Sequence, residues 1–345
     1  MSVSPALPMP TLSPTRAFPP LDPSVDPEFD PGIHLALEHP EQIFSLADLG
    51  YEMATIAAAP SPVAATSCFR VLSDAGVAAL QGVVEALEPY CRNLQRISRA
   101  VCGGVYQSRF LRGLCLNKEV AAHCSQLMDL ELHPHSLPHQ LGHLNYTPKT
   151  PGENIDKWHV DTLRFDYVLF VTDPKDVAGG EFQYFKGTAR EMAALATSGA
   201  PFPEDRIVSP AMPGPGYAVL QQGNMVVHRA KGLDHSVMNK AEYSGLERIT
   251  MVNGYVPADV SYPDYTAFEQ LYRIDPPDVI AGEYARHIAW MAEQHLKAML
   301  AHQPGSQDKS SLSKQLASIA QQLNQAAEDL SSAQAGNLNH FGDGV

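Results

Sequence analysis

The sequence lacks any apolar run long enough to cross a membrane, which takes about 18 consecutive apolar residues. Its opening residues also lack the basic start and the apolar stretch that mark a secretory signal. Apolar residues nevertheless make up 44% of the chain, which is enough to bury a core. We therefore expect a globular, cytoplasmic protein that does not bind a membrane.

Basic residues are scarce as well. The chain has 24 Lys and Arg against 38 Asp and Glu, which gives a formal net charge of −14. Affinity for a phosphate backbone comes from clustered Lys and Arg, so this balance argues against nucleic acid as a partner.

Cysteines are few and form no motif. The sequence has five of them, an odd number, and no two share CxxC spacing. They are Cys68, Cys91, Cys102, Cys115 and Cys124. This pattern fits neither a disulfide framework nor a zinc site. We interpret these residues as reduced, mostly buried thiols of a cytosolic chain.

Changes in composition divide the chain into regions. Residues 1–32 contain nine prolines and little apolar periodicity, so we predict a flexible arm there. Residues 33–141 are predicted to be a region of helices and strands that packs on the core, with a helix over 73–93. Residues 258–302 are predicted to form helices. Residues 303–345 form a tail rich in Gln, Ser and Ala with one amphipathic helix.

Residues 142–257 have the composition of a β-rich core. Short runs rich in β-branched and aromatic residues alternate there with Gly and Pro turns, which favours a sandwich or barrel. The predicted strands are 144–146, 167–171, 181–185, 217–220, 225–227 and 248–252. Residues 188–213 interrupt them with a helix and a Pro-rich loop, which we interpret as an insertion or lid. The predicted fold class is α+β with a mainly β core, flanking helices and a C-terminal helical extension.

The tail carries a stripe of apolar residues at alternating spacings of four and three. Its members are Leu312, Leu316, Ile319, Leu323, Ala326 and Leu330. The stripe is shorter than a coiled coil needs. It therefore leaves two readings open: a helix packed on the body of the same chain, or a homodimer contact.

One short motif has the spacing of a metal site. His159 and Asp161 are two residues apart, which places both side chains on the same side of an extended segment. A third ligand from a distant strand would complete a set of two imidazoles and one carboxylate. Such a set leaves coordination positions open and suits Fe(II) that must bind oxygen.

The order of the motifs that follow is more specific than any one of them. A Gly179-Gly180-Glu181-Phe182 turn comes first, then Asp234-His235-Ser236-Val237, then Glu247-Arg248-Ile249-Thr250. Over residues 142–257 the chain resembles the Fe(II)/2-oxoglutarate-dependent oxygenase superfamily. The resemblance implies a distorted double-stranded β-helix, or jelly roll.

The resemblance also implies a ligand set. His159, Asp161 and His235 would bind Fe(II). Arg248 would pair with the distal carboxylate of 2-oxoglutarate, since a guanidinium can form two parallel bonds to it, and Thr250 would add a hydroxyl contact.

His228 is the alternative to His235 as the third ligand. His235 stands 13 residues before Arg248, whereas His228 stands 20 residues before it. The spacing in the family is roughly ten to fifteen residues, and His235 also lies in the usual H-x-V context. We therefore favour His235 and expect His228 to lie on the preceding strand or turn.

The implied reaction consumes O2 and 2-oxoglutarate. We predict hydroxylation of an unactivated C–H bond in a small polar metabolite of secondary metabolism, such as an amino acid or a similar acid. Desaturation and ring closure at the same site are alternatives. Related halogenases lack the carboxylate that Asp161 provides, which argues against halogenation.

Several residues near these motifs are candidates for binding. Arg164 could pair with a substrate carboxylate, although it could equally be a surface arginine or pair with Asp166. The aromatic candidates for the substrate pocket, each of which could instead be a core residue, are Trp158, Phe165 and Tyr184. Asn145 and Tyr146 stand where the family often places a cosubstrate contact.

Other classes of protein fit less well. A nucleic-acid demethylase of this superfamily would carry a second arginine where this chain has Gly254. A catalytically silent scaffold acting through its tail would not be expected to retain His159, Asp161, His235 and Arg248. A zinc hydrolase would have no use for Arg248.

Overall fold

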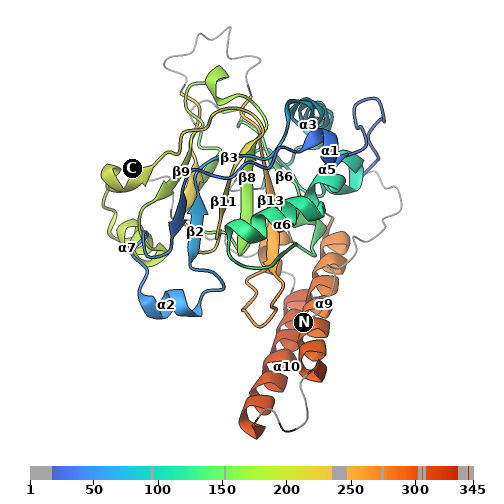
Figure 1. The fold of residues 1–345 in the computed structure, drawn as a ribbon, viewed down its shortest axis with the longest axis vertical. Coiled ribbons are helices and arrows are strands. Elements are labelled where there is room, and N and C mark those ends of the chain that lie inside the picture. The colour runs from blue at the N-terminus through green and yellow to red at the C-terminus, as the bar shows by residue number, and fades with distance from the viewer. Residues whose placement is uncertain are drawn as a thin grey trace.

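Two antiparallel sheets face each other in the computed structural model, and helices flank them (Figure 1). The structure describes residues 18–94, 97–150, 153–234, 247–272, 276–301, 305, 308–332 and 341. The helices are α1 (Pro31–His34), α2 (Met53–Ala58), α3 (Asp74–Leu87), α4 (Gly104–Gln107), α5 (Arg109–Cys115), α6 (Lys118–Leu127), α7 (Ala189–Ser198), α8 (Phe268–Leu271), α9 (Pro277–Ala301) and α10 (Lys309–Ser332).

The larger sheet runs in the order β1-β2-β11-β8-β13-β6-β4, with β3 joined to β11 and β5 joined to β13. Its strands are β1 (Ile43–Ser45), β2 (Val63–Thr66), β3 (Phe69–Arg70), β4 (Ala100–Val101), β5 (Leu132–Pro134), β6 (His143–Asn145), β8 (Phe165–Phe170), β11 (Tyr217–Gln221) and β13 (Thr250–Pro257). The smaller sheet runs in the order β10-β9-β12-β7. Its strands are β7 (Asp156–His159), β9 (Phe182–Phe185), β10 (Ile207–Val208) and β12 (His228–Ala230).

Strand β8 shows how the layers are built. Its side chains alternate between the two faces of the larger sheet. Tyr167 and Leu169 belong to the core formed with the helices α3, α5 and α6, which cover one face. Val168 and Phe170 belong to a second core, which includes Phe182 of the smaller sheet. Because β8 is buried on both faces, its sequence is almost wholly apolar, and its one charged residue, Asp166, stands out.

The predicted helix over 73–93 is observed as α3, followed by a 3-10 turn, η1 (Glu88–Tyr90). Ser73 caps it by accepting a hydrogen bond from the backbone N–H of Gly76. None of the five cysteines forms a disulfide, and Cys102, Cys115 and Cys124 are buried. In the described residues, no helix combines the length and hydropathy of a membrane span.

Helices α9 and α10 lie side by side and project away from the sheets (Figure 1). Ile319 and Ala326 of the tail stripe are buried, and Ala326 joins a cluster with Ile280 and Tyr284 of α9. The tail helix therefore packs within the chain, which is one of the two alternatives that the sequence left open. A homodimer contact stays a prediction, since Leu316 and Leu323 remain 53% and 44% exposed.

Part of the predicted flexible arm is in fact packed on the body. Phe18 is buried, and the side chain of Asp26 accepts hydrogen bonds from Ser108 Oγ and from the backbone N–H groups of Arg109 and Phe110, at the start of α5. A carboxylate that satisfies free N–H groups at a helix start fixes the chain locally despite its prolines. Residues 1–17 lie outside the described residues.

Two further expectations need correction. The predicted strand at 225–227 is a turn, because the N–H groups of Met225 and Val226 both bond to the carbonyl of Gln222, and the strand begins at His228. Residues 33–141 do more than pack on the core, since they supply β1 to β5 to the larger sheet. The stretch 188–213 contains α7 and also β10, and its action as a lid stays a prediction.

Candidate metal centre and cosubstrate site

The predicted pair His159 and Asp161 meets a third residue, His228, at one point between the sheets. His159 Nε2 lies 3.2 Å from Asp161 Oδ1, and His228 Nε2 lies 3.3 Å from Asp161 Oδ2. His159 ends β7 and His228 begins β12, and the register pairs these two residues directly across the sheet. Two imidazole nitrogens and a carboxylate oxygen are thus close enough to bind one ion.

Hydrogen bonds on the far side of each ring aim both Nε2 atoms at this point. Nδ1 of His159 lies 2.6 Å from the carbonyl oxygen of Lys157, and Nδ1 of His228 lies 2.9 Å from that of Val226. A carbonyl can only accept, so each Nδ1 carries the proton and donates it. Each Nε2 can then offer a lone pair to a metal, which is the arrangement found around metal-binding histidines.

The electrostatics of the group favour a cation. Burial opposes the charge on Asp161, but the imidazoles of His228 and His159 outweigh it and hold the pKa of this carboxyl well below its usual range. Burial likewise opposes a charge on His228, but Asp161 outweighs it and raises the pKa of His228 to about 9. In the protein without metal a proton therefore occupies the place of the cation, and metal binding would displace it.

Asp166 is an acidic neighbour that the sequence analysis did not select. It is fully buried, and its Oδ1 accepts a hydrogen bond from Gln221 Nε2 at 3.1 Å. Burial and the nearby charge of Asp161 raise the pKa of Asp166 well above its usual range. Its sequence signal is a carboxylate inside an otherwise apolar strand, where an ionisable group needs a reason to be buried.

Arg248 lies on the facing sheet, just before β13, with its side chain in the same cavity. It is 1% exposed, its Nε donates to the carbonyl of Gly180 at 2.8 Å, and its Nη1 donates to Thr250 Oγ1 at 3.1 Å. No carboxylate of the described residues forms an ion pair with it. Burial lowers its pKa to about 10. A buried guanidinium without such a partner is a site for an anionic ligand.

Two glycines make room for the site. A side chain at Gly180 would come within 3.3 Å of Arg248 Cγ, and its φ of +74° also favours glycine. A side chain at Gly223 would come within 2.8 Å of Asp161 Oδ2 and within 2.2 Å of Asp166 Oδ2. Gly180 therefore leaves space for Arg248 and Leu233, whereas a side chain at Gly179 would come within 2.6 Å of the carbonyl oxygen of Gly232.

Thr250 and Asn145 line the cavity with Arg248, as predicted for cosubstrate contacts. They are direct neighbours on β13 and β6. Asn145 Oδ1 is buried and has no hydrogen-bond partner among the described residues. Tyr146 is different: it follows Asn145 on an extended segment and points to the other face, where its hydroxyl donates to the carbonyl of Val84 at 2.7 Å.

The residues predicted to bind substrate are not among those that line this cavity. Trp158 alternates with His159 and is buried on the other side of the smaller sheet, against Phe202. Phe165 alternates with Asp166 and belongs to the core under the helices. Tyr184 packs in the core between the sheets.

Arg164 is occupied elsewhere too. Its Nε donates to the carbonyl of Pro263 at 2.6 Å, and its guanidinium stacks over the ring of Tyr265 at 4.8 Å. Other polar groups line the open side of the cavity, and none of them was selected from the sequence. They are Gln140, His143, Thr162, Glu269 and Gln270.

His235 lies outside the described residues, so its predicted role as a ligand stays a prediction. Among the described residues, the position of the third ligand is filled by His228. Counting residues back from Arg248 pointed to His235, whereas strand register brings His228 opposite His159. The signal that favours His228 is its place at the end of the apolar run Met225-Val226-Val227.

A second group of metal-binding residue types lies at the base of α9, formed by His135, Asp264 and His287. Here hydrogen bonds within the group explain how the imidazole rings are held, and no metal is needed for that. The N–H of Leu137 donates to His135 Nδ1 at 3.1 Å, so Nε2 of this ring carries the proton. His287 Nε2 lies 2.9 Å from Asp264 Oδ2, and Ser136 Oγ lies 2.6 Å from His287 Nδ1. We interpret this group as a polar contact that docks α9.

No protein-family model and no curated protein matches the chain. Similar solved structures include EctD from S. alaskensis in its apoform, at 18% identity and a TM-score of 0.41, over 68% of this chain and 84% of that one.

HygX from Streptomyces hygroscopicus with nickel and 2-oxoglutarate bound is 14% identical with a TM-score of 0.37, over 59% of this chain and 85% of its own. The non-heme alpha ketoglutarate dependent epimerase SnoN from nogalamycin biosynthesis is 16% identical with a TM-score of 0.33, over 61% and 81% of the two chains. Similarities of this degree decide neither family nor function, so both rest on the residues of the site.

Proposed function

We propose that this protein is an Fe(II)- and 2-oxoglutarate-dependent oxygenase. The observation that carries the proposal is that two groups of site residues line one cavity. One is the group of His159, Asp161 and His228, with both imidazoles oriented by backbone carbonyls. The other is the buried guanidinium of Arg248, which forms no ion pair with a carboxylate of the described residues. A metal and a dianionic acid would satisfy both.

Each residue of the site then has a defined role. His159, His228 and Asp161 would hold Fe(II), with Asp161 supplying the negative charge that partly offsets the metal. Arg248 and Thr250 would bind the distal carboxylate of 2-oxoglutarate, and Asn145 would offer a further polar contact. Bound Fe(II) would supply the activation of O2 that couples decarboxylation of 2-oxoglutarate to oxidation of a substrate C–H bond.

We propose a small polar molecule as the substrate. Support comes from the open side of the cavity, where Gln140, Thr162 and Gln270 offer hydrogen bonds and Glu269 offers a negative charge. An amino acid or similar acid stays within this class, although Arg164 no longer supports a carboxylate contact. Hydroxylation is the outcome we favour, with desaturation or ring closure by the same residues as the alternative.

We further propose that the two facing sheets form the distorted double-stranded β-helix of this superfamily. The placement of the motifs supports this: the metal ligands come from the smaller sheet, and Arg248 and Thr250 come from the larger one.

We also propose a homodimer through α10. Leu316 and Leu323 are exposed on one side of this helix, which has Lys309 at its start and Glu328 near its end. Two antiparallel copies that pair Leu316 with the partner's Leu323 would bury both side chains at the contact.

Anaerobic purification followed by metal analysis and a succinate assay tests the proposed function. Wild-type protein should retain Fe(II) and release succinate from 2-oxoglutarate when O2 and a panel of amino acids and related acids are added. Asp161→Ala should lose both properties. His287→Gln, which removes the same type of ligand from the second group, is the matched control and should keep them.

The other outcomes identify other classes of protein. Zinc retained without succinate formation would indicate a hydrolase, and no bound metal would indicate a silent scaffold. A product mass increased by one oxygen atom identifies hydroxylation, whereas the loss of two hydrogens identifies desaturation or ring closure.

A further inference from the structure

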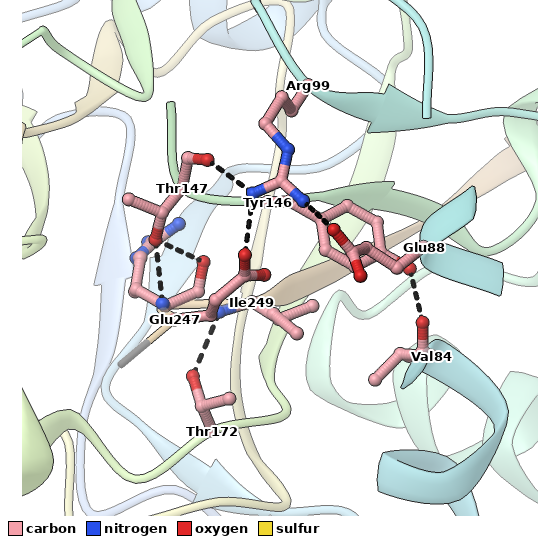
Figure 2. Close-up of polar contacts among 9 residues, drawn as sticks. Val84, Glu88, Arg99, Tyr146, Thr147, Thr172, Glu247 and Ile249 are labelled. Atoms are coloured by element: carbon pink, nitrogen blue, oxygen red, sulfur yellow. Dashed lines mark hydrogen bonds and ion pairs between the residues drawn. The ribbon is translucent and has the colours of Figure 1, made fainter. Parts of the chain in front are cut away.

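The backbone that carries Arg248 is fixed largely by side chains. Residues 247–249 stand just before β13, and the strand ladder reaches them through one bond, which the N–H of Val171 donates to the carbonyl of Ile249 at 3.0 Å. The N–H of Arg248 donates to Thr147 Oγ1 at 2.8 Å, and the N–H of Ile249 donates to Thr172 Oγ1 at 2.9 Å. These threonines lie on opposite sides of the segment (Figure 2). Its position therefore depends on the groups that hold these threonines and the neighbouring Glu247.

Arg99 holds both Thr147 and Glu247. Its Nη1 donates to the carbonyl of Thr147 at 2.9 Å and to Glu247 Oε1 at 2.6 Å, while its Nη2 pairs with Glu88 of η1 (Figure 2). The Arg99 side chain is only 10% exposed. Ion pairs around such a guanidinium are screened less than those at the surface.

Arg99 is itself held against the ring of Tyr146. The guanidinium of Arg99 lies over the ring of Tyr146, 5.5 Å from its centre. The hydroxyl of Tyr146 donates to the carbonyl of Val84 in α3. Arg99 thus connects the segment of Arg248 to a helix of the main core.

Glu247 and Arg248 are consecutive residues, and in an extended segment such neighbours point to opposite sides. Glu247 points to Arg99, outside the metal cavity, and Arg248 points into it. The contact that holds the Glu247 side chain against Arg99 therefore also sets the direction of the Arg248 side chain. We propose that Arg99 and Glu247 are positioning residues, which hold the Arg248 guanidinium at the distance from the metal that a bound 2-oxoglutarate spans.

This inference rests on the proposed function, because it assigns Arg248 to the cosubstrate. Its consequence is specific: loss of the Arg99–Glu247 contact should weaken binding of 2-oxoglutarate while metal binding is retained. Partners that orient a metal ligand typically change affinity by about 10-fold to 100-fold when removed, and we expect an effect of the same order for the groups that orient Arg248. We expect Glu247→Ala to raise the KM for 2-oxoglutarate about 10-fold or more, with kcat at saturation within about twofold of wild type.

The test compares Glu247→Ala with Glu88→Ala. Both remove a carboxylate from the same guanidinium, but Glu88 belongs to η1 and forms no hydrogen bond or ion pair with residues 247–249. Binding of 2-oxoglutarate to the Mn(II)-loaded protein, measured by calorimetry without O2, should weaken in the first variant and change by less than about threefold in the second. Arg99→Lys should be intermediate, because an ammonium keeps the charge but cannot reach all three partners.

The outcomes separate this inference from the proposed function. If the wild-type protein binds Mn(II) but no 2-oxoglutarate, the proposed function fails. If the wild type binds 2-oxoglutarate and the two alanine variants bind it equally well, the positioning role is refuted. Circular dichroism and Mn(II) affinity show that each variant is folded, and a variant of Glu247 that also loses Mn(II) would count against a specific effect on Arg248.

Discussion

Replacing Arg248 with methionine should separate the effect of this buried charge on stability from its contribution to the binding of 2-oxoglutarate. Burial lowers the pKa of Arg248 from 12.5 to about 10, so at neutral pH the fold disfavours this charge by about 3 kcal/mol. Arg248→Met removes that cost but also removes the hydrogen bonds to Gly180 and Thr250, worth about 1 to 3 kcal/mol each when a buried partner is left unpaired. The two bonds together are worth about 2 to 6 kcal/mol, so the free energy of unfolding of the ligand-free protein should change by about 3 kcal/mol or less.

Binding of 2-oxoglutarate should respond very differently. Removing one partner of a buried charge pair costs about 2 to 5 kcal/mol, which corresponds to an increase in Kd of about 30-fold to 5,000-fold. At a concentration of about 100 times its Kd, the ligand should stabilise wild-type protein by about 2.7 kcal/mol. At the same concentration it should stabilise Arg248→Met by less than about 1 kcal/mol.

Urea unfolding of the Mn(II)-loaded proteins without O2, with and without 2-oxoglutarate, measures both quantities. The expected result is a ligand-free midpoint close to wild type together with a lost response to the ligand. Equal stabilisation of wild type and Arg248→Met by 2-oxoglutarate would refute the assignment of this residue to the cosubstrate. A variant that is unfolded without ligand would refute the estimate that the two stability terms are similar.

The remaining predictions concern three other places. His228→Ala should abolish Fe(II) retention and His235→Ala should not, and metal analysis with the reverse result would restore the sequence-based choice. Burial, with the neighbouring His287, lowers the pKa of His135 from 6.5 to about 3, so the folded ring stays neutral while the unfolded one takes up a proton below pH 6.5. The free energy of unfolding therefore keeps the full contribution of the neutral ring above pH 6.5 and decreases as the pH falls towards 3, by about 2 kcal/mol at pH 5. In urea unfolding, His135→Gln should lack this loss between pH 8 and pH 5, and an unchanged pH dependence would exclude His135 as its source. Leu316→Glu with Leu323→Glu should halve the mass measured by light scattering, and a wild type that is already monomeric would exclude the dimer.

The sequence predicted the parts of the site that depend on local spacing. The pair His159 and Asp161 follows from the two-residue period of an extended segment, and the capped helix α3 follows from Ser73 and its apolar periodicity. Arg248, Thr250 and Asn145 line the same cavity. The first two were selected from the motif Arg248-Ile249-Thr250, and Asn145 was selected from the family resemblance.

The failures have a common physical cause. Trp158 and Tyr146 each stand beside a residue that lines the cavity, His159 and Asn145, and neighbours on a strand face opposite ways. Phe165 was chosen for its closeness to the motif of His159 and Asp161, which does not determine the face that it takes on β8. The third ligand could not be settled by counting from Arg248, because the pairing of His228 with His159 is a long-range register. The docking of residues 18–30 depends on Asp26 meeting α5, which no local pattern shows.

The metal-binding imidazoles and the Arg248 guanidinium belong to different layers, so a loss of packing between the layers should affect them differently. The imidazoles are neighbours within one small sheet, so a slight separation of the layers leaves their mutual distances unchanged. The same separation would carry the guanidinium away from the metal. Mild heating or a cavity at Val219, in the core between the layers, should therefore stop turnover while iron stays bound, at temperatures well below cooperative unfolding.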